Sequence, residues 1–266
     1  MLLVMKKHTL AIVGCGKLAH IIVDAFNQDM LDCYELVATY SRTKQKAIDI
    51  AEKANGANCK ACDSMEELLD IKPNYIVETA SPASLREFAI LALKNGSSIV
   101  TLSIGALADK SFYEEVQKVA KENNTRVHLA SGAIGGFDVL RTVALMGNCT
   151  ATFDTEKGPN SLKNTAVYDE MLQTDRRQVF NGDAVEAIEL FPTRVNVAVA
   201  AALASVGPQE MKVSMTSTPG FIGDDHRIEI RNDQVHAVID VYSSTAQIAG
   251  WSVVNTLRNI TSPIAF

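Results

Sequence analysis

A glycine-rich turn near the start of the chain constrains the fold more than any other feature of the sequence. It follows an apolar run at residues 9–13, which is typical of a parallel strand buried on both faces. The turn, Gly14-Cys15-Gly16-Lys17-Leu18-Ala19, has the spacing G-x-G-x-x-[GA], and apolar residues recur at helical spacing after it. The first glycine permits a tight bend, the second lets a ligand approach the backbone, and the small third residue lets helix and strand pack closely. This pattern predicts a dinucleotide site at the positive end of the helix, with contacts from Gly14, Gly16, Lys17, Leu18 and Ala19.

Strand-like and helix-like segments continue to alternate through the first half of the chain. We predict further strands at residues 34–40, 75–78, 98–102 and 126–129. Helices are predicted at 47–54, where Asn55-Gly56 would end the helix, after Ser64, after Ser81 and at 111–123. This order requires parallel strands with helices on both faces of the sheet. The predicted fold class is therefore α/β, with a doubly wound parallel-sheet (Rossmann) domain at residues 1–132.

The second half of the chain has a different pattern. Residues 150–155, 212–217, 227–231 and 235–242 alternate apolar and polar side chains, as strands with one solvated face do. A strongly apolar helix is predicted at 195–205. We expect a second, α+β domain at residues 133–244, built on a mainly antiparallel sheet, for substrate binding and oligomerisation. An amphipathic helix within the C-terminal segment 245–266 is expected to pack back on the first domain.

Composition and charge exclude several classes of function. The chain has 266 residues, of which 47% are hydrophobic and 21% charged, as expected of two packed globular domains. A net charge of −6 gives no attraction to nucleic acids or to an anionic membrane. In the first seven residues the charges follow the apolar side chains, which is the reverse of a secretory signal. We therefore expect a cytoplasmic protein that binds neither nucleic acids nor membranes.

The five cysteines do not predict a disulfide framework, because their number is odd and no secretory leader is expected. Cys59-Lys60-Ala61-Cys62 has the C-x-x-C spacing of half a zinc site or of a redox pair. No second C-x-x-C and no nearby His-x-His completes such a site. The alternative is two small residues in a strand and in the turn after it, and no metal site is predicted.

The end of the second predicted strand bears on which dinucleotide is bound. An acidic residue there would accept hydrogen bonds from the ribose 2′-hydroxyl of NAD, but this chain has Ser41, Arg42 and Lys44. These side chains could hold the 2′-phosphate of NADP, although Arg42 could also stack on the adenine of either cofactor. We expect NADP or NAD, with NADP slightly favoured. Ala80 and Ser81 follow another strand and are expected either to line the nicotinamide half of the site or to form a simple turn.

Four segments resemble, in order and spacing, the L-aspartate dehydrogenase family. They lie at residues 103–107, 130–136, 191–198 and 225–229, with the sequences SIGAL, ASGAIGG, FPTRVNVA and DHRIE. The resemblance covers nearly the whole chain. It implies oxidative deamination of L-aspartate to oxaloacetate and ammonia through iminoaspartate, or the reverse reaction, with NAD or NADP. It also implies that His226 is the catalytic acid/base and that Ala133 and Asn196 contact the cofactor.

The chain departs from the pattern of this family at three places. The family commonly has an acidic residue near Ser41, a basic residue followed by two prolines where this chain has Glu156-Lys157-Gly158-Pro159, and asparagine at Arg194. A dicarboxylic substrate needs cations or helix N-termini to hold its carboxylates. Lys157 and Arg194 are therefore candidates for that role.

A histidine suits a reaction that moves protons near neutral pH. His226 follows Gly223-Asp224-Asp225, which we expect to form a turn, and either aspartate could orient its ring. Two alternatives remain open: an NADPH-dependent reductase of a related imino or keto acid, and a non-catalytic NADP-binding sensor. The resemblance also allows iminoaspartate to be supplied to pyridine nucleotide biosynthesis. An exposed sheet in the second domain would suit a homodimer or a homotetramer.

Overall fold

The structure is a computed structural model that describes residues 7–54 and 58–266. Asn55-Gly56, the predicted end of a helix, lies outside the described residues. The chain forms two compact units. Within the described residues, the first unit contains the chain up to Ala106 together with Lys110–Ala130 and Ala249–Phe266. The second unit contains Leu107–Asp109 and Ser131–Ile248.

The first unit is built on a six-stranded sheet in which every pairing is parallel and the strand order is β3-β2-β1-β4-β5-β6. The strands are β1 (His8–Val13), β2 (Tyr34–Tyr40), β3 (Lys60–Ala61), β4 (Tyr75–Glu78), β5 (Ser98–Thr101) and β6 (Val127–Leu129). The chain moves outward from β1 in one direction and then outward from β4 in the other. The carboxyl ends of β1 and β4 are therefore neighbours at a topological switch point, where open α/β sheets bind ligands. This topology confirms the predicted doubly wound fold.

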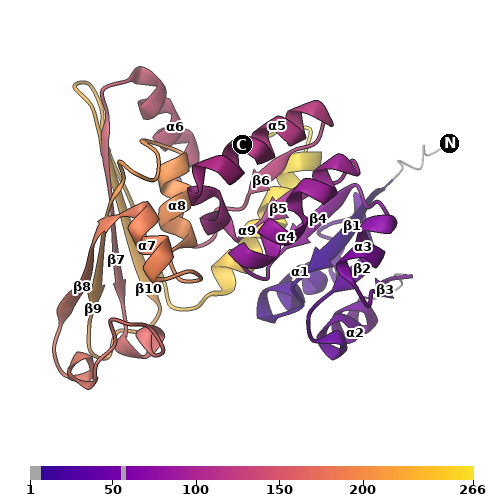
Figure 1. Cartoon of the computed structure of the whole chain (residues 1–266), viewed down its shortest axis with the longest axis horizontal. Helices are drawn as coiled ribbons and strands as arrows, with labels where there is room; N and C mark the ends of the chain where they lie inside the picture. Colours follow the sequence, from indigo (N-terminus) through magenta and orange to yellow (C-terminus); the bar gives the residue numbers. More distant parts are fainter. Residues whose placement is uncertain (1–6, 55–57) are drawn as a thin grey trace. The chain divides into compact units, whose positions relative to one another are not determined.

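One face of this sheet is covered by three helices that share a hydrophobic core with it (Figure 1). They are α1 (Lys17–Asn27), α2 (Lys44–Lys53) and α9 (Gln247–Thr261). Leu10 and Ile12 of β1 pack in this core with Val253 and Leu257 of α9. The Tyr34 hydroxyl also donates a hydrogen bond of 2.8 Å to the carbonyl of Leu257. The last helix of the chain is thus tied to the first unit.

The opposite face carries α3 (Met65–Asp70), α4 (Pro82–Lys94) and α5 (Lys110–Glu122). The starts of α3 and α4 agree with the predictions because their capping signals are local. Ser64 Oγ accepts the N–H of Glu67, and Ser81 Oγ accepts the N–H of Ser84. Pro82 occupies the first turn of α4. A short 3₁₀ helix, η1 (Ile104–Ala108), precedes α5.

The second unit contains a five-stranded sheet with the order β11-β10-β7-β9-β8. Three of its pairings are antiparallel and one, between β7 and β9, is parallel. This confirms the predicted mainly antiparallel sheet. The strands are β7 (Thr150–Lys157), β8 (Arg177–Asp183), β9 (Lys212–Ser217), β10 (Asp224–Arg231) and β11 (His236–Ser243). β8 was not expected, because its sequence RQVFNGD shows no regular apolar alternation.

Helices α6 (Phe137–Met146), α7 (Ala184–Leu190) and α8 (Asn196–Leu203) lie on one side of this sheet (Figure 1). They contact β10, β9 and β7 respectively. Only α8 was predicted. Two 3₁₀ helices, η2 (Pro159–Leu162) and η3 (Glu170–Gln173), lie between β7 and β8. The buried face of the sheet is apolar along most of its length but carries polar side chains at one end of β7 and β10.

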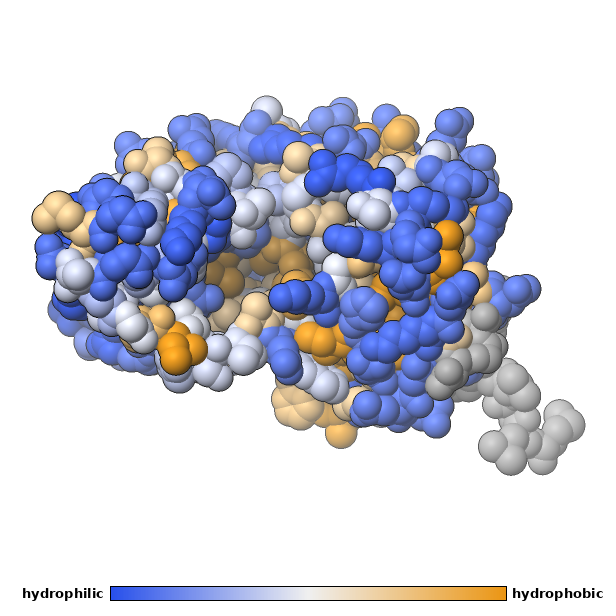
Figure 2. All heavy atoms as spheres, turned by 90° about the horizontal axis from the view of Figure 1, so that it is seen from below, coloured by the Kyte–Doolittle hydropathy of each residue, from blue (hydrophilic) through white to orange (hydrophobic). Residues whose placement is uncertain are grey.

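Hydrophilic side chains predominate on the face of the molecule shown in Figure 2. None of the helices in the described part of the chain has the length and apolar character needed to cross a membrane.

Candidate functional site

The first candidate site is the turn between β1 and α1. Gly14 has a φ of +93°, a conformation that favours glycine. Its N–H donates to the carbonyl of Tyr40 at 2.9 Å, and its carbonyl accepts from the Thr79 hydroxyl at 2.6 Å. A Cβ at Gly14 would lie 2.6 Å from the backbone nitrogen of Ala80. The turn is thus fixed to β2 on one side and to the loop after β4 on the other.

The second glycine of the turn faces open space. Gly16 is the N-cap of α1, and a Cβ built on it would meet no described atom within 4 Å. No side chain caps this end of the helix, so the first N–H groups of α1 are available to a ligand. Ala19 is fully buried against the strand. Open space beside uncapped helix amides fits a dinucleotide pyrophosphate.

A cavity of about 210 Å³ lies beside this turn. Five of the eleven predicted cofactor residues line it, and the other six do not: Lys17, Leu18, Ala19, Ser81, Ala133 and Asn196. Its wall is formed by the ends of β1, β2 and β4 and the residues that follow them: Val13, Gly14, Cys15, Gly16, Tyr40, Ser41, Arg42, Thr43, Lys46, Thr79, Ala80 and Ser84. The carboxyl edge of the sheet therefore brings together the turn and the residues that bear on cofactor choice.

Of the two basic residues predicted to hold a 2′-phosphate, Arg42 lines this cavity and Lys44 does not. Lys44 was expected to help hold a 2′-phosphate, but its Nζ binds the Ala61 carbonyl and the Asp63 carboxylate, each at 2.6 Å. Lys46, one helical turn away from Thr43, lines the cavity instead. Neither Arg42 nor Lys46 makes an ion pair with any described residue. The pair of cations that faces the cavity is thus Arg42 and Lys46.

A second candidate site is a polar cluster on the buried face of the sheet of the second unit. His226 of β10 lies opposite Thr155 of β7, and Asp224 lies opposite Lys157. The Nδ1 atom of His226 is 2.9 Å from the Thr155 hydroxyl, and the Lys157 ammonium pairs with the Asp224 carboxylate. His226, Thr155 and Lys157 are each at most 5% exposed. The hydroxyl oxygen of Ser217, opposite Lys157 on β9, is buried and has no hydrogen-bond partner among the described residues.

This arrangement corrects the prediction for the surroundings of His226. Asp224 and Asp225 belong to β10 and do not form a turn before the histidine. The strand register turns alternate side chains to opposite faces, so Asp225 points away from the histidine while Asp224 reaches Lys157. The residue that orients the ring is Thr155, seventy-one positions earlier in the chain. The ring centroids of Phe153 and His226 are 5.5 Å apart, so the imidazole has an apolar neighbour on this face of the sheet.

Burial is the largest influence on the pKa values of His226 and Lys157. It lowers the pKa of His226 to about 4, with a further lowering by the Lys157 charge and an opposing effect of Asp224. Burial also lowers the pKa of Lys157, and Asp224 acts against that shift. At neutral pH His226 is therefore an uncharged imidazole, able to take up a proton. Lys157 pairs with the Asp224 carboxylate, whose charge favours the ammonium form of the lysine.

The remaining predicted residues of the second unit lie around the start of α8. A Cβ at Gly132 would lie 3.1 Å from Val197 Cγ1, so the loop that carries Ala133 packs against the helix that begins at Asn196. Arg194 donates to the carbonyls of Ser161 and Lys163. Arg194 therefore holds the loop after β7 in place. Two of its guanidinium nitrogens already donate to backbone carbonyls of that loop, which leaves fewer donors for a substrate carboxylate.

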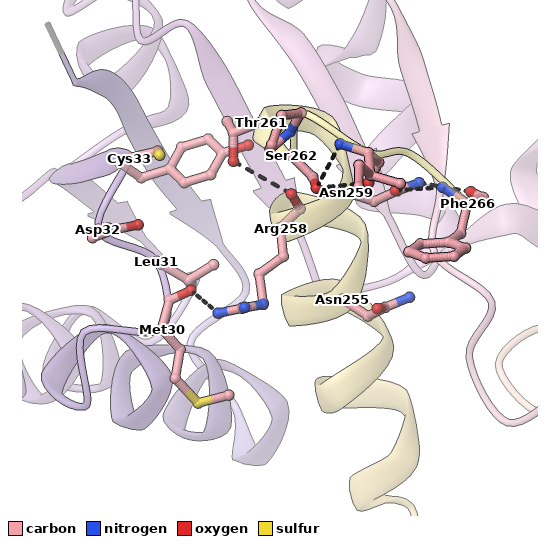
Figure 3. Close-up of a pocket in the computed structure, with 13 residues that line it drawn as sticks. Met30, Leu31, Asp32, Cys33, Asn255, Arg258, Asn259, Thr261, Ser262 and Phe266 are labelled. Atoms are coloured by element: carbon pink, nitrogen blue, oxygen red, sulfur yellow. Dashed lines mark hydrogen bonds between the residues drawn. The ribbon is translucent and has the colours of Figure 1, made fainter. Parts of the chain in front are cut away.

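Of the five cysteines, Cys15 alone lines the cofactor cavity. All five cysteines are free, and burial raises the pKa of the Cys15 and Cys59 thiols to about 12, so both stay protonated. In the described parts of the chain, no group of three or more His, Cys, Asp or Glu residues could hold a metal ion. A separate cavity of about 350 Å³ lies by the C-terminal turn of α9, where Arg258 donates to the Met30 carbonyl (Figure 3). It contains none of the predicted site residues.

Comparison with known proteins finds a match for each of the two units. A family model described as "Aspartate dehydrogenase, C-terminal" matches residues 138–260, and one described as "Homoserine dehydrogenase, NAD binding domain" matches residues 14–130. An L-aspartate dehydrogenase of Methanococcus maripaludis strain C5 is 30% identical, with 95% of this chain and 97% of that protein covered. The chain belongs to the L-aspartate dehydrogenase family. The L-aspartate dehydrogenase of Methanocella arvoryzae is also 30% identical over 96% of this chain and 97% of its own.

Solved structures give the same relationship. The aspartate dehydrogenase of Thermotoga maritima superposes with a TM-score of 0.78 at 28% identity, covering 97% of this chain and 99% of that one. A hyperthermophilic archaeal homoserine dehydrogenase, with a TM-score of 0.64 at 14% identity over 98% of this chain and all of its own, shares the fold. Membership of the L-aspartate dehydrogenase family confirms the predicted class, an NAD(P)-dependent oxidoreductase. It favours the dehydrogenase prediction over the reductase and sensor alternatives.

Proposed function

We propose that this member of the L-aspartate dehydrogenase family oxidises L-aspartate to oxaloacetate and ammonium, with one water consumed and one NAD(P) reduced per turnover. The observation that carries the proposal is the neutral, buried imidazole of His226 held by Thr155 beside the Lys157–Asp224 ion pair. A base and a cation on the same buried face suit a substrate that carries both an amine and carboxylates.

The first unit binds the cofactor. The Gly14 turn and the first amides of α1 hold the pyrophosphate, and Ser41 and Arg42 hold the adenosine ribose. When bound, the cofactor would supply the oxidant, a nicotinamide that can take the α-hydrogen of the substrate as a hydride. Because Arg42 and Lys46 both face the cavity, we favour NADP as the preferred cofactor.

His226 moves the protons of the reaction. The substrate ammonium must lose a proton before its α-carbon can be oxidised, and a water must lose one when it attacks the resulting imine. An imidazole that takes up a proton at Nε2 carries its own hydrogen at Nδ1, and the Thr155 hydroxyl oxygen is placed to accept that hydrogen. In this tautomer Thr155 accepts the Nδ1 hydrogen, and Nε2 is the nitrogen that acts as the base.

Lys157 holds a substrate carboxylate. Its ammonium has three donors, of which the Asp224 carboxylate takes one. No other described group is bonded to Lys157 Nζ. The unpartnered Ser217 hydroxyl, opposite Lys157 in the register, can donate to the same anion. We assign the binding of one carboxylate of aspartate to these two side chains.

In a cell, we expect the enzyme in the cytoplasm as a homodimer or homotetramer.

The test is the ultraviolet absorbance of the reduced nicotinamide, recorded with purified protein, NAD or NADP, and a panel of amino acids. We expect reduction with L-aspartate and none with D-aspartate or L-glutamate. His226→Ala serves as the matched variant, because it should abolish turnover and leave the cofactor dissociation constant unchanged. Reduction with another amino acid in place of L-aspartate would contradict the proposed substrate. Full activity of the His226 variant would contradict the proposed base.

A further inference from the structure

A buried carboxyl group lies directly behind the cofactor cavity, and nothing in the proposed function uses it. Glu78 is the last residue of β4 and is 0% exposed. It makes no ion pair with any described residue. A carboxyl group placed so deeply without a cation is costly unless hydrogen bonds satisfy it.

The Glu78 carboxyl group accepts four hydrogen bonds, three from two different loops and one from the end of β5. Oε1 accepts the backbone N–H groups of Ala80 at 2.7 Å and Ser81 at 2.9 Å, both in the loop after β4. Oε1 also accepts the Ser103 hydroxyl at 2.9 Å, and Oε2 accepts the Thr101 hydroxyl at 2.6 Å. The last two donors belong to β5 and to the loop that follows it. The carboxyl group thus joins two loops at the carboxyl edge of the sheet.

The first of these loops is the surface on which the dinucleotide turn rests. A Cβ at Gly14 would lie 2.6 Å from the Ala80 nitrogen and 2.7 Å from the Ala80 Cβ, so the two backbones are already in close contact. Thr79 donates its hydroxyl to the Gly14 carbonyl, and Thr79 and Ala80 both line the cavity. A shift of the Ala80 backbone would therefore move the Gly14 turn or change the cavity wall.

We propose that Glu78 is a positioning residue for the dinucleotide: its carboxyl group ties the loop after β4 to the loop after β5 and so holds the wall against which the Gly14 turn is built. The inference rests on the dinucleotide binding of the proposed function and does not depend on the identity of the amino acid. Burial raises the pKa of this carboxyl group, and its four hydrogen bonds act against that shift.

Three variants of the full-length protein separate positioning from general stability. Glu78→Gln keeps one oxygen that can accept from Ala80 and Ser81, whereas Glu78→Leu keeps none. Ser103→Ala removes only the donor from the second loop. The matched control is Ser97→Ala, which removes an equally buried hydroxyl, bonded to the Pro73 carbonyl at 2.6 Å, from the opposite edge of the same sheet. Each variant is compared with the wild type in thermal unfolding and in titration calorimetry with NADP and NAD.

We expect Glu78→Gln to raise the dinucleotide dissociation constant about 10-fold and Glu78→Leu about 100-fold, as lost and unsatisfied buried hydrogen bonds do. Ser103→Ala should raise it about 5-fold. The Michaelis constant for the cofactor should rise in parallel, while kcat at saturating cofactor stays within about twofold of the wild type. Ser97→Ala should lower the unfolding temperature by a similar amount and leave the dissociation constant unchanged.

Dinucleotide affinities of the Glu78 variants that equal the wild-type value, together with a lower unfolding temperature, would overturn the inference. An equal loss of affinity in Ser97→Ala would overturn it as well. If Glu78→Leu does not fold, Ser103→Ala decides, because wild-type affinity in that variant contradicts the link between the two loops. A wild-type chain that binds no dinucleotide would contradict the proposed function instead, so the two failures are distinguishable.

Discussion

Replacing Thr155 by valine should slow the enzyme without changing its fold. Valine has nearly the same shape, so the change removes only the hydroxyl that lies 2.9 Å from His226 Nδ1. Thr155 and His226 are 4% and 3% exposed, so water cannot replace the lost partner easily. An unsatisfied buried polar group costs about 1–3 kcal/mol. If that cost falls on the state in which Nε2 is the base, kcat drops about 5- to 150-fold.

The assay is steady-state formation of reduced dinucleotide from L-aspartate at saturating cofactor. Thr152→Val is the matched control, since it makes the same change on the same strand but at a side chain outside the buried cluster. Thr155→Ser should restore most of the rate, because serine keeps the hydroxyl. A kcat for Thr155→Val within about twofold of the wild type, or an equal loss in Thr152→Val, would refute the role given to Thr155.

Three further predictions concern the cofactor turn, cofactor choice and pH. Gly16→Val should abolish binding of both dinucleotides, since its side chain would fill the open space beside α1; unchanged affinity in calorimetry would remove the turn from the site. Arg42→Ala should weaken NADP about 10-fold and NAD much less, and equal losses would contradict the 2′-phosphate contact. The pKa of His226 falls from 6.5 in the unfolded chain to about 4 in the folded one, so the unfolded state binds the extra proton between these values. Stability is therefore full above pH 6.5 and is lost as the pH falls toward 4, by about 3 kcal/mol in total; His226→Asn should lack that part of the dependence in denaturant unfolding at each pH.

The features that could be predicted from the sequence are those fixed by neighbouring residues. The Gly14 turn needs only a preceding strand and a following helix, and the caps at Ser64 and Ser81 involve residues three positions away. The apolar alternation of β9 likewise depends on the strand alone. Local signals of this kind are sufficient to predict the doubly wound domain, the mainly antiparallel sheet and the family.

The features that were missed depend on contacts between distant segments. Thr155 contacts His226 only because β7 and β10 pair in one particular register. The sequence alone does not show this register, so it does not indicate the contact. Lys44 looked available for a phosphate until the pairing of β2 with β3 placed Ala61 beside it. Glu78 ends an apolar strand, and its four partners come from the loop after β4, the end of β5 and the loop after β5, which the sheet brings together. β8 was missed because its pairing with β9 stabilises a sequence that has no clear strand pattern.

The most direct test of the proposed reaction is the stoichiometry of its products. L-aspartate and oxidised dinucleotide are incubated with the wild-type protein, and oxaloacetate, ammonium and reduced dinucleotide are quantified in the same sample. We predict that the three products form in equal amounts and that His226→Ala forms none of them while still binding the dinucleotide. Tight dinucleotide binding by the wild type without any of the three products from L-aspartate would contradict the proposed function.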